Sequence, residues 1–514
     1  MNGAEALIRT AAGAGVEVCF ANPGTTEMHL VAALDAAPGI RAVLALFEGV
    51  VTGAADGYAR LSGKPALTLL HLGPGFANGI ANLHNARRAS SPIVNVIGDQ
   101  ATWHLAADAP LTSDIESLAR PVSRWLRKAA TAAALASDTA EAIAAARARS
   151  GGVSTLIVPA DCAWGESPGP VPAKPVEPRP GVAFSAVDAA ARRLRASESP
   201  VLLIGGDALG RRGQIAAARI GAAARARVFL GTFPACVERG AGLPPLPKFP
   251  YFPEQGVELL SKATDLVLAG VPEPVAFFGY PKLPSRLTPE TCRITVLAEP
   301  DQDATPALEA LAEALGAKPD AGVRGTREDF PVATGKLDSE TLGRTLARLQ
   351  PEGAIVVDEA ATSGAQWFSL AGGAAPHTVL SLTGGAIGQG LPNAGGAAIG
   401  CPGRRVIAFQ ADGSAMYTVQ SLWTMARENL DVTVLVCANR AYRILKVELA
   451  RADITHPGPA ARALTDLQPP ALDFVSLARG LGVPAERAEN AEQLAAALGR
   501  ALATRGPSLV EAVI

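Results

Sequence analysis

Two short polar turns carry the residue types that bind a metal ion, and each follows an apolar run typical of a buried strand. Asp412, Gly413 and Ser414 lie in "QADGSAMYTVQ", directly after "RVIAF", and Asn439 lies in "VCANRAY", 27 residues after Asp412. That spacing is about one β-α-β step, so both turns are expected at the carboxyl ends of neighbouring parallel strands. A carboxylate, an amide oxygen and a backbone carbonyl form an all-oxygen set, which suits Mg²⁺ or Ca²⁺ and does not suit zinc.

This ligand set is too small to fill an octahedron, so such an ion would share its coordination sphere with phosphate oxygens. The Gly413-Ser414 turn opens a helical stretch and offers backbone N–H groups to the same anion. The alternative is structural, with "ADGS" as a surface turn and Asn439 as a helix cap. Asn439 at the matching distance favours the metal and phosphate site.

Two further reactive side chains follow strand-like runs nearer the N-terminus. Glu48 begins the helical stretch "EGVVTGAADGYARLSG", just after "AVLALF", and His71 ends the run "ALTLLHL". Both have ordinary structural explanations. A glutamate at a helix N-terminus interacts favourably with the helix dipole, and a lone histidine at a strand end is more often a packing residue.

The elements that must position these residues alternate along almost the whole chain, as short apolar runs and Ala-rich helical stretches. Such alternation is typical of an α/β fold with parallel sheets. Pro-rich segments at 166–181 and around 318–340 separate three sets of runs and predict domains at 1–165, 182–318 and 340–514. The expected strands are 16–20, 66–72, 93–98 and 154–160, then 201–206, 265–270 and 293–298, and finally 354–360, 405–410 and 432–439.

The composition is that of a globular protein and narrows the class of partner. The chain has 514 residues, 48% of them hydrophobic, and a formal net charge of −2. The near-neutral balance argues against a nucleic-acid partner. The six cysteines show no C-x-x-C spacing and are expected to be buried thiols in a reducing compartment. With no secretory signal, and no apolar run of the roughly 20 residues a membrane span needs, we expect a cytoplasmic protein without a membrane partner.

Asp412-Gly413-Ser414 followed by Asn439 resembles the thiamine-diphosphate (ThDP) motif of the pyruvate-decarboxylase-like superfamily. Other blocks are similar, in the same order, to benzoylformate decarboxylase and, less closely, to the acetolactate synthase large subunit. They are "FANPGTTEMHL", "LALFEGVVTGAADGYARLSGKPA", "LLHLGPGFANGIANLHNARRASSPIV", "GGAIGQGLPNAGGAAIG" and "GPSLVEAVI". The resemblance implies three doubly wound parallel-sheet domains. The first would bind the pyrimidine, the second would be the middle domain, and the third would bind the diphosphate with Mg²⁺.

The resemblance also implies roles for individual residues of the third domain. Asp412, Asn439 and the backbone oxygen of Ala441 would bind Mg²⁺. Ile387 would lie under the cofactor and force its V shape, and the Gly385 carbonyl would accept a hydrogen bond from the 4′-amino group. One departure is Ala411, where the family usually has glycine.

In the first domain, the match implies that Glu48 hydrogen-bonds N1′ of the aminopyrimidine and that His71 handles protons on the bound intermediate. Thr25 would orient the substrate carboxylate, with Thr26 as the substitute if the register is shifted by one. The remaining histidines have no motif partner and are interpreted as structural or surface residues: His29, His84, His104, His377 and His456. Family members hold the two ends of the cofactor with different subunits, so at least a homodimer is implied, and a homotetramer is common.

The implied activity is decarboxylation of a 2-keto acid through an enamine, with a carboligase of acetolactate-synthase type as the alternative. A ThDP-binding homologue with a regulatory or assembly role is the third reading, and the intact Glu48, Asp412 and Asn439 argue against it. The stretch 269–283 lacks the decarboxylase's second histidine, so Phe277 or Phe278 would fill that space, which would favour carboligation.

Other positions bear on the same choice. The pocket loop would put Ile444, Leu445 and Glu448 near the substrate. Leu111 matches the decarboxylase, and the chain stops at Ile514 without the synthase's C-terminal lid. The flavin-binding segment of the synthase is not found either, so FAD is an open alternative and not an expected cofactor.

Overall fold

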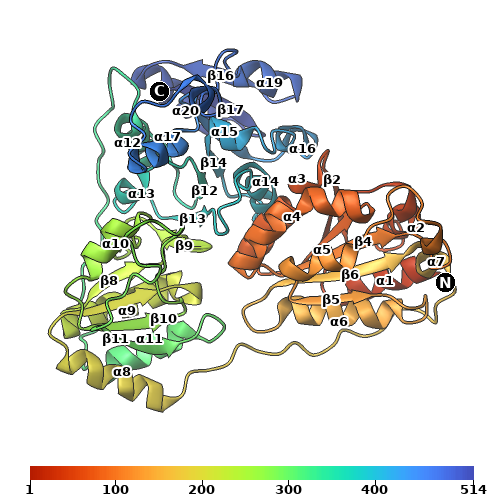
Figure 1. Ribbon diagram of the computed structural model, residues 1–514, viewed down its shortest axis with the longest axis horizontal. Helices are drawn as coiled ribbons and strands as arrows, with labels where there is room; N and C mark the ends of the chain where they lie inside the picture. The colour runs from red at the N-terminus through yellow and green to blue at the C-terminus, as the bar shows by residue number, and fades with distance from the viewer. The chain divides into compact units, whose positions relative to one another are not determined.

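The strands gather into three sheets built from parallel pairs, which confirms the predicted α/β class with three parallel-sheet domains. The computed structural model describes residues 1–514 (Figure 1). The chain separates into two compact units. One comprises Met1–Glu177, Phe330–Trp367 and Leu380–Ile514, and the other Pro178–Asp329 and Phe368–Val379. The domain boundaries 1–165, 182–318 and 340–514 stay a prediction.

The first sheet has the strand order β2-β1-β3-β4-β6-β5. Its central strands are mostly apolar and buried along nearly their whole length, as expected for strands covered on both faces. The strands are β1 (Val18–Asn22), β2 (Arg41–Leu44), β3 (Ala66–Leu70), β4 (Ile93–Asp99), β5 (Trp125–Lys128) and β6 (Val153–Pro159). The helices are α1 (Gly3–Gly13), α2 (Met28–Leu34), α3 (Glu48–Ser62), α4 (Leu72–Ala89), α5 (Ile115–Ala119), α6 (Leu135–Arg147) and α7 (Ala160–Trp164).

Successive residues of β1 face opposite layers, because side chains alternate along a strand. Cys19 belongs to the core formed with α1 and α6, which includes Leu7. Its neighbour Phe20 belongs to the core formed with α3 and α4, which includes Val50 and Phe76. The sheet therefore has helices on both faces (Figure 1).

The sheet of the C-terminal region includes the strand order β16-β17-β15-β14-β12-β13. Its strands are β12 (Ile355–Glu359), β13 (His377–Ser381), β14 (Val406–Ala411), β15 (Val432–Ala438), β16 (Ala485–Ala488) and β17 (Ser508–Val513). Its helices are α12 (Ser339–Leu349), α13 (Trp367–Leu370), α14 (Gly390–Gly400), α15 (Asp412–Ala415), α16 (Ser421–Arg427), α17 (Arg443–Arg451), α18 (Pro459–Ala463), α19 (Phe474–Gly480) and α20 (Ala491–Ala503).

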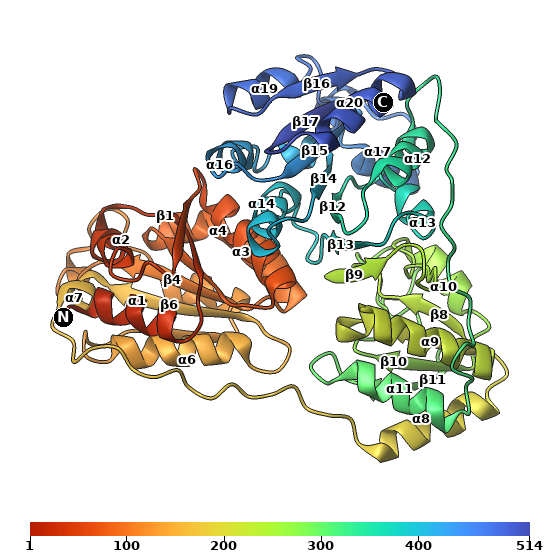
Figure 2. The same ribbon diagram turned by 180° about the vertical axis from the view of Figure 1, so that it is seen from behind.

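Helix α14 packs directly against α3, and small residues permit the close approach (Figures 1 and 2). A Cβ at Gly57 would lie 2.1 Å from the backbone oxygen of Asn393, and one at Gly396 would lie 1.8 Å from the backbone oxygen of Ala54. Between the two helices the buried Asp56 accepts from Arg60, Gln389 and Asn393. The first sheet therefore shares one compact unit with strands β12, β14, β15, β16 and β17 of the C-terminal sheet.

The second unit contains a smaller parallel sheet of order β11-β10-β7-β8. Leu203 and Leu268 of its central strands share one core with Leu260 of the neighbouring α10. The elements are α8 (Phe184–Ala196), β7 (Pro200–Ile204), α9 (Arg211–Ala224), β8 (Arg227–Leu230), β9 (Cys236–Arg239), α10 (Pro253–Leu260), β10 (Asp265–Ala269), β11 (Arg293–Ala298) and α11 (Ala304–Ala314).

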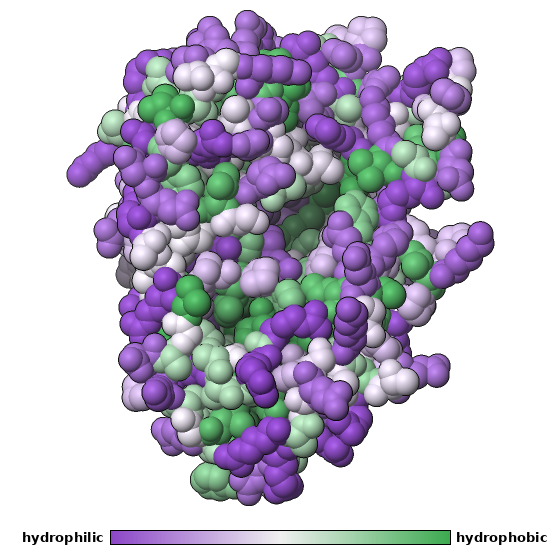
Figure 3. All heavy atoms as spheres, turned by 90° about the vertical axis from the view of Figure 1, so that its left-hand side faces the viewer, coloured by the Kyte–Doolittle hydropathy of each residue, from purple (hydrophilic) through white to green (hydrophobic).

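The outer surface is mixed in character. In the face drawn in Figure 3, apolar patches lie among a largely polar surface. None of the helices combines the length and apolar character needed to cross a membrane.

Candidate active site

The candidate residues of the first domain follow neighbouring strands at one edge of the sheet. Glu27 follows β1, Glu48 follows β2 and His71 follows β3, and these three strands are adjacent in the order β2-β1-β3. Because the strands are parallel, their carboxyl ends meet at the same edge. This edge is where ligands bind in open α/β sheets.

Glu48 is the first residue of α3, and it is only 8% exposed. The side-chain amide of Asn78 donates to its Oε2 at 3.0 Å. Gly75 lies against the other oxygen, because a Cβ there would come within 2.9 Å of Glu48 Oε1 and 3.2 Å of His71 Cβ. Glu48 and His71 thus flank the same first turn of α4. The role given to Glu48 stays a prediction.

His71 is held by a buried glutamate that the sequence analysis did not single out. Glu27 is fully buried, and its Oε2 lies 2.8 Å from His71 Nδ1. The same oxygen accepts from the Gly24 N–H at 2.8 Å, and Oε1 accepts from Thr26 Oγ1 at 2.6 Å. Since the carboxylate can only accept, Nδ1 carries the hydrogen, and Nε2 is left for another partner.

Two glycines make room for this pair. A Cβ at Gly24 would lie 2.3 Å from the His71 ring, and one at Gly98 would lie 1.8 Å from Glu27 Oε1. Of the two threonines considered for the substrate carboxylate, Thr26 lies 3.3 Å from His71 Nδ1, whereas Thr25 is exposed at the start of its 3₁₀ turn. The roles given to His71 and Thr25 stay predictions.

In the C-terminal domain, Asp412 and Asn439 follow the adjacent strands β14 and β15, in register from Val406↔Val432 to Ala411↔Cys437. Asp412 is 2% exposed, and its two oxygens accept from the backbone N–H groups of Gly413 at 2.8 Å and Arg440 at 2.6 Å. Burial raises the pKa of Asp412, against the lowering effect of these hydrogen bonds. A buried carboxylate with only backbone donors is one that a cation would stabilise.

The neighbouring groups fit a divalent ion that also binds phosphate. Asn439 donates from Nδ2 to Ser363 Oγ at 3.1 Å, so its Oδ1 faces the Ala441 N–H at 3.0 Å. No cluster of three or more His, Cys, Asp or Glu side chains forms a metal site anywhere in the chain. An ion at Asp412 would therefore have a single charged protein ligand and need oxygen ligands from a bound anion.

The turn that follows Asp412 contains the two residues predicted to donate to that anion, and this role stays a prediction. Gly413 and Ser414 lie in the first turn of α15 and are buried. Ala411 precedes them at φ −82°, which alanine adopts as readily as glycine, so this departure from the family leaves the turn intact. A Cβ at Gly413 would lie 2.4 Å from the Tyr442 ring.

The loop before α14 carries the other two predicted cofactor residues. Gly385 is exposed with φ +79°, a left-handed conformation that favours glycine, and Ile387 is half-buried. Glu359, at the end of β12, accepts from the N–H groups of Gly388 at 2.8 Å, Gln389 at 3.1 Å and Gly390 at 2.8 Å. Burial raises the pKa of Glu359 to about 7, although the three N–H donors act in the opposite direction.

The buried carboxylates of the chain fall into two groups, according to whether a lysine or arginine side chain pairs with them. Five buried acids each have an arginine or lysine partner: Asp56, Asp99, Asp138, Asp265 and Glu511. The remaining four have none: Glu27, Glu48, Glu359 and Asp412. Every buried acid without a basic Lys or Arg partner therefore lies in the candidate site.

Other residues suggested for substrate contact have partners of their own. Phe277 and Phe278 are partly exposed members of an aromatic cluster with Phe233 and Tyr251 in the second unit. Glu448 pairs with Arg451 at 2.9 Å on α17.

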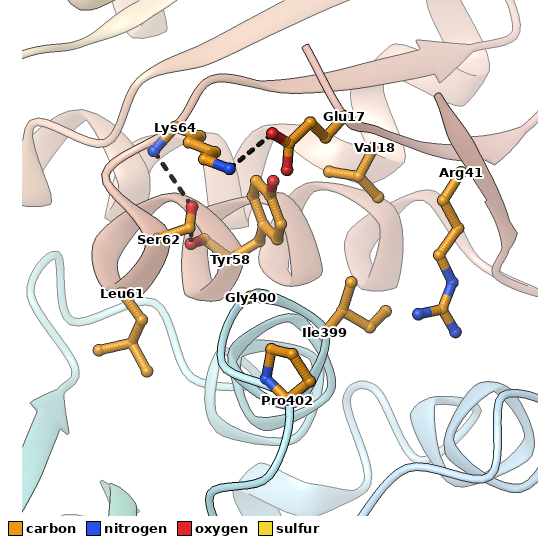
Figure 4. A pocket seen from close by; sticks show the side chains of 10 residues that line it. All are labelled: Glu17, Val18, Arg41, Tyr58, Leu61, Ser62, Lys64, Ile399, Gly400 and Pro402. Carbon is orange, nitrogen blue, oxygen red and sulfur yellow. Dashed lines mark hydrogen bonds and ion pairs between the residues drawn. The ribbon is translucent and has the colours of Figure 1, made fainter. Parts of the chain in front are cut away.

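A separate hollow of about 510 Å³ lies near the end of α3 that is remote from Glu48 (Figure 4). Its charged side chains are already paired, Lys64 with Glu17 at 2.5 Å and Arg41 with Glu428 at 2.6 Å. It offers no unsatisfied charge to a ligand.

Comparison with known proteins shows the family to which the chain belongs. Residues 1–118 match the family model for the thiamine pyrophosphate enzyme N-terminal TPP binding domain, and residues 362–512 match the C-terminal TPP binding domain. The chain therefore belongs to the thiamine pyrophosphate enzymes. It is a ThDP-dependent enzyme related to both acetolactate synthase and benzoylformate decarboxylase.

Individual relatives cover nearly the full chain. A Mycobacterium tuberculosis protein provisionally named acetolactate synthase large subunit IlvX is 50% identical over 516 residues, 100% of this chain and 99% of the relative. Benzoylformate decarboxylase of Pseudomonas aeruginosa is 30% identical over 528 residues, 97% and 96% of the two chains. The fold matches the ThDP-dependent 4-hydroxybenzoylformate decarboxylase of Rhodococcus jostii RHA1, with a TM-score of 0.86, 24% identity and coverage of 99% and 98%.

Proposed function

We propose that the protein is a Mg²⁺- and ThDP-dependent enzyme that decarboxylates a 2-keto acid. The observation that carries this proposal is that Glu48 and Asp412 are buried acids with only neutral donors, which a cationic cofactor ring and a divalent ion would neutralise. When bound, ThDP supplies the electron sink for loss of CO₂.

The chain's own residues hold and protonate the reactants. Asp412, Asn439 and the Ala441 carbonyl hold Mg²⁺, and the N–H groups of Gly413 and Ser414 hold the diphosphate. Glu48 shares a proton with the ring nitrogen N1′ in a dry pocket. Support for this comes from its burial and from its neutral donor Asn78.

His71 delivers protons to the bound substrate from Nε2, because Glu27 engages Nδ1. Thr25 or Thr26 orients the substrate carboxylate. Thr26 has the stronger geometric support, since it contacts both Glu27 and His71.

Carboligation of acetolactate-synthase type is the second candidate. It is favoured by the 50% identity to the relative named an acetolactate synthase large subunit. The absence of a histidine in 269–283 points the same way, because slower protonation after CO₂ loss leaves more time for a second carbonyl to be captured. We propose a cytoplasmic homodimer or homotetramer for either reaction.

The deciding experiment is an anaerobic assay of the Mg²⁺- and ThDP-loaded protein with pyruvate and with benzoylformate, in which CO₂, aldehyde and acyloin are scored separately. Glu48→Gln should lower turnover by about 10²-fold or more, the effect usual for a lost proton transfer. Glu17→Gln, an exposed glutamate of the same domain, is the matched control. Turnover of Glu48→Gln within a factor of two of wild type would contradict the role assigned to Glu48.

A further inference from the structure

The loop that carries Gly385 and Ile387 is held by a side chain of the other cofactor-binding domain. Asn85 of α4 is fully buried. Its Nδ2 donates to the Ala386 carbonyl at 2.7 Å, and its Oδ1 accepts from the Ala386 N–H at 3.2 Å. The backbone oxygen of Asn85 also accepts from Thr383 Oγ1 at 2.8 Å. One asparagine therefore satisfies both backbone groups of the residue just before Ile387.

Two neighbours of Asn85 on α4 extend this contact. The His84 Nε2 donates to the Gly384 carbonyl at 3.1 Å. Asn82 Nδ2 lies 2.8 Å from the Gly49 carbonyl and 3.3 Å from the Gly388 carbonyl. Since Gly49 directly follows Glu48, Asn82 links the start of the glutamate's helix to the residue after Ile387.

The fit between α4 and the loop is close. A Cβ at Gly384 would lie 2.5 Å from Asn85 Oδ1 and 2.7 Å from the His84 ring. On its other side the loop is held within its own domain, where Thr418 Oγ1 donates to the Gly388 carbonyl at 2.9 Å and Glu359 accepts from the Gly388 N–H. Ile387 thus lies between two residues whose backbones are both fixed.

We propose that Asn85 is a positioning residue that sets the place of Ile387 and of the Gly385 carbonyl. This inference rests on the proposed function and on the roles that the family resemblance implies for Ile387 and Gly385, which are to shape the bound cofactor and to accept a hydrogen bond from it. Unlike His84 and Asn82, Asn85 hydrogen-bonds both the N–H and the C=O of one loop residue, Ala386. Its carboxamide therefore fixes the orientation of the loop backbone as well as the distance of the loop from α4.

The decisive substitution is Asn85→Asp, which keeps the size of the side chain. It replaces the Nδ2 donor with an oxygen that faces the Ala386 carbonyl, so an attractive contact becomes a repulsive one. Asn85→Ala removes both contacts without adding a charge and serves if the aspartate variant does not fold. The matched control is Asn95→Asp, a fully buried asparagine of β4 whose partners are Thr68 and Thr155 and not the loop.

Two measurements are needed. The first is hydrogen–deuterium exchange of the cofactor-free protein, read on peptides that cover 383–390. The second is the equilibrium affinity for ThDP in the presence of Mg²⁺. For Asn85→Asp and Asn85→Ala we expect exchange of these amides to become about tenfold faster or more and the Kd for ThDP to rise about tenfold, the change that one net hydrogen bond can produce. Asn95→Asp should leave both unchanged.

The outcomes separate this inference from the function on which it rests. Unchanged exchange over 383–390 in Asn85→Ala would overturn the hold on the loop. Faster exchange with an unchanged Kd for ThDP would overturn the positioning role. If the wild type takes up no ThDP, the proposed function fails and the positioning role with it, whereas the exchange data still decide whether Asn85 holds the loop.

Discussion

Gly98→Ala is the sharpest test of the Glu27–His71 pair, because it displaces the pair without removing either residue. The added Cβ would lie 1.8 Å from Glu27 Oε1, whereas real Cβ contacts are hardly ever closer than 3.0 Å. The carboxylate must therefore move by about 1.2 Å or more. That shift breaks or stretches its hydrogen bonds with Thr26 at 2.6 Å and with His71 at 2.8 Å.

The expected loss follows from this displacement. A misplacement of about 1 Å at catalytic groups lowers turnover about 10²-fold. Each charge-assisted hydrogen bond that is lost costs about 1.5–3 kcal/mol, so the thermal midpoint should fall as well. Affinity for ThDP should stay within about twofold of wild type, because Asp412 and Asn439 belong to a different sheet.

The assay is steady-state product formation with the 2-keto acid that the wild type accepts, together with ThDP titration and thermal unfolding. Gly39→Ala is the matched control, since a Cβ there meets nothing within 4 Å. Thr26→Val, which removes one donor to Glu27, is the milder companion if Gly98→Ala does not fold. Turnover of a folded Gly98→Ala variant within threefold of Gly39→Ala would refute the reasoning, as would a loss explained entirely by weaker ThDP binding.

Three further substitutions test other parts of the site. His71→Ala should change the ratio of aldehyde to acyloin more than the Kd for ThDP; an unchanged ratio with weaker cofactor binding would make it a structural histidine. Asp412→Asn should weaken Mg²⁺-dependent ThDP uptake by about tenfold or more yet raise the unfolding midpoint of the cofactor-free protein, because it removes a buried charge; unaltered uptake would contradict its role as a ligand. In the folded protein the pKa of Glu359 is about 7, above its ordinary value of 4.5, so the folded state binds this proton more tightly than the unfolded state. The free energy of unfolding that this proton contributes is fully present below pH 4.5 and is lost as the pH rises through 7. Relative to Glu359→Gln, the wild type should therefore lose about 2 kcal/mol of unfolding free energy between pH 5.5 and 8 in urea titrations, and a constant difference would argue against the raised pKa.

The central strands could be predicted from the sequence nearly to the residue. β14 and β15 were expected at 405–410 and 432–439 and span Val406–Ala411 and Val432–Ala438. They are buried along nearly their whole length and are therefore almost entirely apolar in sequence. The strands that were not predicted include β5, with sequence "WLRK", and β16, with sequence "AERA". Both are sheet edges with charged residues, so neither has an apolar run.

The partners within the site were harder to predict. Glu27 lies in "NPGTTEMHL", where no spacing marks it, and its partner His71 is 44 residues away. The two meet because β1 and β3 are neighbours in the sheet, a fact of strand order that local pattern does not contain. The same holds for Asn85 and Ala386, which are 301 residues apart. Sequence motifs predict the metal and cofactor residues, whereas packing determines which side chains hold those residues in place.

The buried acids divide by partner into those that stabilise the fold and those predicted to bind ligands. A carboxylate that serves only the fold is stabilised by an arginine or lysine supplied by the chain, as for Asp56 with Arg60. At the site, Glu48 and Asp412 have neutral donors instead, which leaves an uncompensated charge at a cost in stability. A folded chain bears that cost where a bound ion and a cationic ring complete the balance. In the proposed function, Glu48 and Asp412 are therefore the buried acids whose charge is balanced only when the ion and the cofactor are bound.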